Sequence, residues 1–420
     1  MPLLSRLRNS FDASVAGLPR AFWFLWAGTF ITRAGSFVLP FLALYLTQVL
    51  GLSLSHAGMV VSLYGAGGAI AGPVGGFLAD RVGRRFTIVL ALGVGGAGMI
   101  ALGMMHRVEW IAPTIFLVAL VTEMYRPATQ AAISDMVAPS DRVRAFGVLY
   151  WVINVGFAIG LTVGGLLASK SYFWLFVGDG ATTMVYALLV AFGVPETRPA
   201  TAARVPGTPR PHLLAGFLTP YRDRHFVMFL GLCFLFAMIF MQNATSFALD
   251  MTAHGMSGAV FGRVLALNGV IIVLVQPFLG PVLAKHDRAR TLAAGSALVG
   301  IGFGLNAIAH TVPIYALGVI IWTVGEMGVL PVANAVVADL APPEIRGRYQ
   351  GAYGFAFGLA VCAAPVVGMF VLEHAGSATL WLGCLVTGLG IAAGHLMLSR
   401  SRSAQHGPGS DPSRTRQGAH

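Results

Sequence analysis

The chain has 420 residues, of which 56% are apolar and only 10% are charged. About a quarter of the residues in a soluble domain are charged, so this composition excludes a soluble globular protein. The formal charge of +11 does not indicate a nucleic-acid partner, because the basic residues lie singly or in twos and threes between long apolar segments.

Twelve apolar segments are long enough to cross a hydrocarbon core of roughly 30 Å as helices. The sequence therefore predicts an all-α integral membrane protein with twelve transmembrane helices. The first segment follows several arginines and is too long for the core of a signal peptide, so we expect it to remain as the first span. The predicted spans lie near residues 21–48, 56–79, 86–105, 110–135, 145–168, 172–194, 225–249, 257–284, 290–309, 312–340, 347–372 and 376–399.

The chain repeats itself at a shift of 204 residues, which aligns Pro127–Gly147 with Pro331–Gly351 without a gap. Parallel repeats with a solute site between them are a known plan of transporters. The sequence thus predicts two pseudo-symmetric six-helix bundles, 21–194 and 225–399. We expect residues 1–20 to form a cytoplasmic N-terminal segment, 195–224 a polar cytoplasmic linker, and 400–420 a disordered cytoplasmic tail.

Lysine and arginine are distributed unevenly between the two sides of the predicted bundle. Alternate segments, including both termini, hold 22 of the 27 basic residues, whereas the opposite loops hold only Arg107 and Lys170. Positive residues remain on the cytoplasmic side. The sequence therefore predicts a multi-pass protein of the cell (plasma or inner) membrane with both termini in the cytoplasm.

The segment from Gly76 to Arg85 reads GFLADRVGRR, between the second and third spans. It resembles the signature loop G-x-L-a-D-R-x-G-R-R/K of the major facilitator superfamily. Pro195-Glu-Thr resembles that family's common exit from the sixth span, and Arg126 resembles its buried arginine, although Gln130 follows it by four residues instead of three. Glycines of the fifth span resemble the pattern of the 12-helix bacterial drug:proton antiporters (multidrug efflux), with Leu161 in place of a proline.

This resemblance implies a gate on the cytoplasmic side. It implies that Arg84 pairs with Asp135 and that Asp80 faces the N-terminal end of the eleventh helix, near Arg346 and Gly347. Arg288 and Asp339 align with Arg84 and Asp135, which predicts a weaker mirror latch. The alternative is that these are ordinary solvated loop charges. The candidate gate residues are Gly76, Asp80, Gly83, Arg84, Asp135, Arg288 and Asp339.

Four ionisable residues lie at or near mid-depth in the predicted spans: Arg33, Glu123, Arg126 and Glu326. Each costs roughly 2.5–3.5 kcal/mol or more at the centre of a membrane helix, which favours a functional role. Glu123 and Arg126 are three residues apart and share a helix face. We expect Glu123 to take up and release a coupling proton in competition with Arg126.

We expect Glu326 to bind a cationic substrate or a second proton, and Arg33 to hold one of the two glutamates ionised. The alternative is a static buried ion-pair cluster. Asn154, Gln242, Asn243 and Asn268 are either polar residues of the cavity or bridges between helices. Asp179 and Arg263 either pair as an outer gate or lie separately at the membrane interface.

No motif of a hydrolase, nucleotide-binding loop or paired-cysteine metal site is present in the sequence, which indicates neither an enzyme nor a cofactor or metal. An ion gradient is then the expected energy source. We expect the partners to be a small-molecule substrate, protons and the lipid bilayer, and the protein to be a monomer, the default of the family. The favoured function is proton-coupled efflux of drug-like or lipophilic molecules by alternating access. The alternatives are proton-coupled or facilitated uptake of a sugar, amino acid or organic anion, for which the arginines would be ligands, and a membrane sensor.

Overall fold

The structure is a computed structural model that describes residues 12–36, 38, 41–42, 45–168, 171–199 and 217–405. These residues form helices joined by turns and loops, without strands. Eleven helices in the described part are long and apolar enough to cross a membrane. The prediction of an all-α integral membrane protein is confirmed.

The first half of the chain begins with α2, whose 15 residues are too few to span a membrane alone. α2 ends at Gly35, and the short π-helix η1 (Tyr45–Val49) occupies the end of the same predicted span. The prediction of one unbroken helix over 21–48 is therefore wrong. The helices of this half are α2 (Arg20–Ala34), α4 (Leu54–Arg81), α5 (Arg84–Gly103), α6 (Val108–Glu123), α7 (Tyr125–Met136), α8 (Arg142–Ala168) and α9 (Tyr172–Gly193).

The fourth span is broken between α6 and α7 at Met124. Pro127 follows three residues later and has no N–H to offer the carbonyl group of Glu123. Its ring would also clash with that carbonyl in a regular helix. The break therefore follows directly from the sequence, and it places Glu123 and Arg126 on either side of a helix end.

The second half shows the same kind of interruption in its first span. The predicted span 225–249 is divided by a 3₁₀ turn at Met241–Ala244. The last helix runs to Gln405. The prediction of disorder is therefore wrong for residues 400–405, and residues 406–420 lie outside the described part of the chain. The helices of this half are α11 (Arg224–Phe240), α12 (Ser246–Ala253), α13 (Gly258–Ala284), α14 (Arg288–Gly304), α15 (Val312–Leu340), α16 (Arg346–Ala375) and α17 (Ser377–Gln405).

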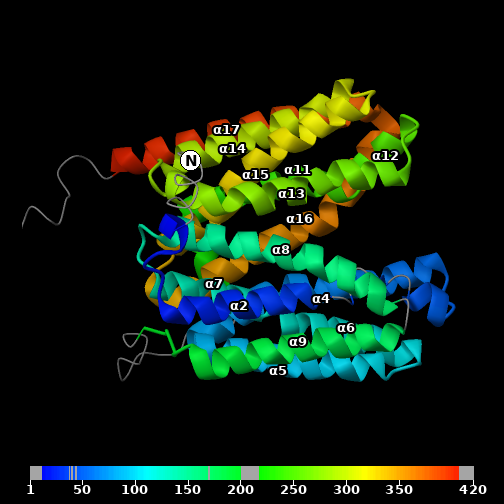
Figure 1. The fold of residues 1–420 in the computed structure, drawn as a ribbon. Coiled ribbons are helices and arrows are strands. Elements are labelled where there is room, and N and C mark those ends of the chain that lie inside the picture. The colour runs from blue at the N-terminus through cyan, green and yellow to red at the C-terminus, as the bar shows by residue number, and fades with distance from the viewer. Residues whose placement is uncertain are drawn as a thin grey trace, which may run out of the picture.

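The helices of each half form one bundle, and the two bundles meet along α4 with α16 and α8 with α13 (Figure 1). Glycines allow α4 and α16 to touch backbone to backbone. A Cβ added to Gly76 would lie 2.1 Å from the carbonyl oxygen of Gly347, and one added to Gly351 would lie 2.4 Å from that of Gly72. Small residues let membrane helices approach in this way.

Candidate functional site

The end of the bundle where α4 passes into α5, here called the Arg84 end, carries a network of buried charges. Arg84 is fully buried; its Nε donates to Asp135 at 3.0 Å, and its guanidinium lies 3.3 Å from Asp80. Gly83 has φ +139°, and a Cβ there would lie 2.3 Å from the carboxylate of Glu196. Glu196 in turn accepts hydrogen bonds from the backbone N–H groups of Arg84 and Arg85.

The same network reaches across to the second half. Asp80 accepts hydrogen bonds from the backbone N–H groups of Gly347 at 2.8 Å and Arg348 at 2.9 Å, at the positive N-terminal end of α16. Arg346 pairs with Asp135. Both contacts expected of the first-half gate residues, Arg84 with Asp135 and Asp80 with the start of α16, are present, and together they tie the two halves at the Arg84 end.

The ion pair of the second half, Arg288 with Asp339, has more partners than expected. Arg288 forms an ion pair with Asp339, as the repeat predicts, but Arg142 of α8 pairs with the same carboxylate. Arg288 also donates to the carbonyl of Pro139 at 2.8 Å. Asp339 therefore joins α15 to the first half as well as to α14 of its own half.

The N-terminal segment forms another link at this end, which the sequence analysis did not predict. Arg144 of α8 donates to the carbonyl groups of Ala13 and Ala16. The Ser14 hydroxyl donates to the carbonyl of Pro277 on α13. The segment thus contacts one helix of each half.

Glu123 and Arg126 pair with each other at the break in the fourth span, where Arg126 donates to Glu123. The Arg126 side chain is 47% exposed and that of Glu123 is 15% exposed. Tyr64 of α4 interacts electrostatically with both. The pair is therefore reachable from outside the protein in this conformation.

Arg33 contacts neither glutamate among the described residues. Its guanidinium donates to the hydroxyl of Tyr125 at 3.2 Å. Arg33 is expected to hold Glu123 or Glu326 ionised in one state of the transport cycle, and this stays a prediction. A Cβ on Gly156 would lie 2.6 Å from the Cβ of Arg33, so a glycine of the fifth span lets α8 pack directly against α2 beside Arg33.

Glu326 is the most enclosed of the four intramembrane charges, with 3% of its surface exposed. One carboxylate oxygen accepts a hydrogen bond from Tyr150 of α8, and the other accepts one from Asn268 of α13 at 2.8 Å. Asn268 also donates to Thr323 at 3.0 Å. Glu326 thus lies at the seam of the two halves, held by neutral donors.

The sequence analysis did not identify Tyr150 as a partner of Glu326, although its spacing from Asn154 was a signal. Tyr150 and Asn154 are four residues apart on the fifth span and share a face, and Asn154 donates to the carbonyl of Tyr150 at 2.9 Å. Of the other amides, Gln242 bridges to the carbonyl of Ala364 on α16 at 3.0 Å, and Asn243 donates within its own turn, to Phe240. The Gln242 contact matches the bridging alternative, whereas the Asn243 contact is local.

Asp179 and a further carboxylate, Asp250, lie in the halves away from the seam. Asp179 accepts a hydrogen bond from the backbone N–H of Val38 at 3.2 Å. Asp250, which the sequence did not single out, is buried and accepts hydrogen bonds from Tyr315 and Ser377. Within the described residues, no group of three or more His, Cys, Asp or Glu side chains is arranged to hold a metal ion.

The family model of the Major Facilitator Superfamily matches residues 25–251 and 228–417. The chain belongs to the Major Facilitator Superfamily. It is therefore a membrane transporter and not an enzyme. Its fold is similar to that of the human organic anion transporter MFSD10 (TETRAN), with a TM-score of 0.76 at 18% identity over 90% of this chain and 99% of that one.

Three of the relatives are bacterial. It is 29% identical to the uncharacterized MFS-type transporter YttB of Bacillus subtilis, over 88% of this chain and 92% of the relative. It is 25% identical to a Na⁺, Li⁺, K⁺/H⁺ antiporter of Planococcus maritimus (78% and 84%). It is 26% identical to the class C tetracycline resistance protein of Escherichia coli (78% and 82%).

Proposed function

We propose that this transporter exports lipophilic, drug-like molecules in exchange for protons, by alternating access. The observation that carries the proposal is the position of Glu326, a buried carboxyl group between the two halves whose hydrogen-bond donors among the described residues, Tyr150 and Asn268, are neutral. The similarity to a tetracycline resistance protein and to a cation/proton antiporter supports the substrate class and the coupling.

An ionised carboxylate inside a membrane costs several kcal/mol unless its surroundings compensate for the charge. Tyr150 belongs to α8 of the first half, whereas Glu326 and Asn268 belong to the second. A movement that separates α8 from α15 removes one of the two donors. The ionised form is then less stable, and Glu326 binds a proton. Proton binding is thereby linked to the relative position of the halves, which antiport requires.

Glu123 has the opposite surroundings. It is paired with Arg126, and both side chains are partly exposed, so its negative charge is already compensated. The sequence predicted Glu123 as the proton carrier, but these contacts favour Glu326 for that role. Glu123 and Arg126 are then the charged groups that a substrate meets on entering between the halves.

A second candidate is uptake of an organic anion, and the exposure of Arg126 favours it. An accessible guanidinium is a good ligand for a carboxylate or phosphate. In that case the anion displaces Glu123 from Arg126, and Glu326 is not needed for substrate-driven proton movement.

Proton flux in everted membrane vesicles tests the proposal. Vesicles energised to an acid interior are given a panel of cationic lipophilic dyes, and collapse of the pH gradient is recorded for the wild type, Glu326→Gln and Glu109→Gln. Glu109 lies in the first turn of α6 and is the matched control. We expect dye-dependent collapse in the wild type and in Glu109→Gln but not in Glu326→Gln.

Dye exchange without a gradient separates lost coupling from lost folding. Glu326→Gln should still exchange labelled for unlabelled dye. Collapse of the gradient that persists in Glu326→Gln contradicts the proposal. Alkalinisation driven by organic anions in right-side-out vesicles, abolished by Arg126→Ala, selects the second candidate instead.

For orientation and location, we propose the inner or plasma membrane with both termini in the cytoplasm, which places the Arg84 end on the cytoplasmic side. The excess of lysine and arginine at that end supports this. Single-cysteine labelling of Lys285→Cys from one side of intact cells tests it. We further propose that the monomer is the working unit.

A further inference from the structure

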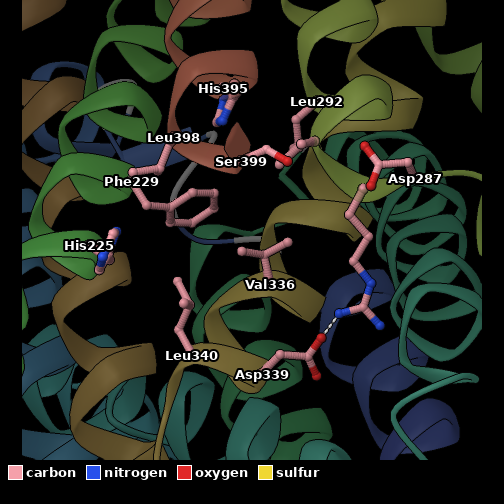
Figure 2. A pocket seen from close by; sticks show the side chains of 12 residues that line it. His225, Phe229, Asp287, Leu292, Val336, Asp339, Leu340, His395, Leu398 and Ser399 are labelled. Atoms are coloured by element: carbon pink, nitrogen blue, oxygen red, sulfur yellow. Dashed lines mark ion pairs between the residues drawn. The ribbon is translucent and has the colours of Figure 1, made fainter. Parts of the chain in front are cut away.

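A cavity of about 680 Å³ lies in the second bundle, between α11, α14, α15 and α17 (Figure 2). It lies at the Arg84 end, where α11 and α14 begin and where α15 and α17 approach their ends. Its inner wall is formed by Phe229, Leu292, Val336 and His395, one helical turn in from the mouth. The ion pair of Arg288 with Asp339 lies at the mouth, and none of the roles discussed above uses the inner part.

The internal repeat explains why the cavity exists in the second half. In the first half, two side chains tie the end of α9 to the start of α5. Glu196 accepts hydrogen bonds from two backbone N–H groups of α5, and Arg85 donates one to the carbonyl of Ala191. At the shift of 204 residues, Arg85 becomes Ala289 and Glu196 becomes Arg400. The second half has lost both partners, and a cavity lies between α14 and α17 where those contacts would be.

The acceptors at the mouth of the cavity are already engaged. Asp287 accepts a hydrogen bond from the backbone N–H of Arg290 at 2.8 Å, and Asp339 is paired with Arg288 and Arg142. In the first half, Glu196 bonds the N–H groups at the start of α5. No described residue accepts from the matching N–H groups of Arg288 and Ala289, the first two of α14.

His395 gives a second, independent sign of a missing ligand. It is 4% exposed and lines the cavity, where its ring contacts that of Phe229 with centroids 5.8 Å apart. No hydrogen bond from any described residue reaches its ring nitrogens. Imidazole carries an N–H in every protonation state that is relevant here. The cavity therefore offers N–H donors that have no acceptor among the described residues, next to apolar walls.

We propose that this cavity binds an anionic phospholipid. The phosphate takes the place that the Glu196 carboxylate has in the first half, at the N-terminal end of α14, where a helix stabilises an anion. An acyl chain or the glycerol backbone reaches the inner wall, and His395 donates to an oxygen of the ester region. Basic pockets between membrane helices are suited to such headgroups, and Arg288 lines this one.

Native mass spectrometry of the purified full chain tests this site. The protein is mixed with phosphatidylglycerol and phosphatidylcholine of identical acyl chains, and the lipid that remains bound is identified. We expect the wild type to retain one phosphatidylglycerol in preference to phosphatidylcholine. His395→Phe removes the N–H donor, and Arg400→Glu restores the carboxylate of the first half. His395→Phe should lower retention of phosphatidylglycerol by about two- to tenfold, the effect of losing one neutral hydrogen bond. Arg400→Glu should lower it by about tenfold, because the new carboxylate competes with the phosphate for the N–H groups of α14.

Lys285→Glu is the matched control, because it makes the same change of charge as Arg400→Glu at the same end, but only Arg400 aligns with Glu196 in the repeat. It should leave retention unchanged. Equal retention of the two lipids by the wild type, or equal losses in Lys285→Glu and Arg400→Glu, overturns the proposal, as does unchanged retention in His395→Phe. Displacement of the lipid by excess glycerol phosphate overturns the assignment to a lipid, because that anion lacks the acyl chains. Proton coupling plays no part in any of these outcomes.

Discussion

Alanine in place of Gly76 should push the two halves apart at the Arg84 end. The added Cβ would lie 2.1 Å from the carbonyl oxygen of Gly347 and 2.7 Å from its carbon, and these backbone atoms of α16 cannot rotate away. Overpacking of this kind costs about 1–3 kcal/mol. The cost applies only while α4 and α16 remain in contact. We therefore expect the equilibrium to shift toward an open Arg84 end by about 5- to 150-fold.

Spin labels on the two halves measure this shift. Val82 and His286 are both exposed at the Arg84 end, one in each half, and labels there report the separation of the bundles. The native cysteines Cys233, Cys362 and Cys384 are replaced first. Pulsed electron double resonance should show the long-distance population rising in Gly76→Ala relative to the parent protein.

Gly65→Ala is the control, because it lies on the same helix and no atom lies within 4 Å of its added Cβ. Both variants gain the same helix propensity, roughly 1 kcal/mol, so only the contact with α16 differs. The reasoning is refuted if Gly76→Ala keeps the parent distance distribution, or if Gly65→Ala shifts it equally.

Three further changes test the charges described above. Arg84→Ala removes a fully buried cation and leaves two buried carboxylates without their partner. We expect the free energy of unfolding to fall by about 3–5 kcal/mol, with a clearly lower Tm in detergent. An unchanged Tm would contradict this role. Arg288→Ala should lower the Tm less than Arg84→Ala, because its side chain is 28% exposed and a second arginine remains on Asp339. Tyr150→Phe removes the donor that the first half supplies to Glu326 and should reduce dye-driven proton flux about tenfold, with little change in Tm; flux at the wild-type level would show that the hydroxyl is dispensable.

The sequence predicted the positions of the helices well where the length of an apolar segment alone determines a span. Apolar length fixes a span, so most predicted spans match helices within a few residues. The same rule does not detect an interruption inside an apolar segment. Gly35 ends α2, and the 3₁₀ turn at Gln242 ends α11, yet both lie in segments whose average composition is that of an unbroken span.

The site was predictable only where a motif fixes the contact. The signature loop implied that Arg84 meets Asp135, and the structure contains that contact. Arg142 on Asp339 and Tyr150 on Glu326 join residues separated by 197 and 176 positions. Which residues face each other across the seam depends on how the two bundles pack, and no pattern within one half contains that information.

The helix break at Met124 changes what mutagenesis of the fourth span can reveal. Pro127 cannot donate to the carbonyl of Glu123, so this backbone oxygen lacks the donor that a regular helix would supply. The side chain of the same residue pairs with the exposed Arg126, and we predict that a substrate reaching this pair also donates to the backbone oxygen. Replacing the Glu123 side chain leaves that oxygen in place, so a side-chain scan would miss a contact made through it. Restoring the N–H with Pro127→Ala would remove it.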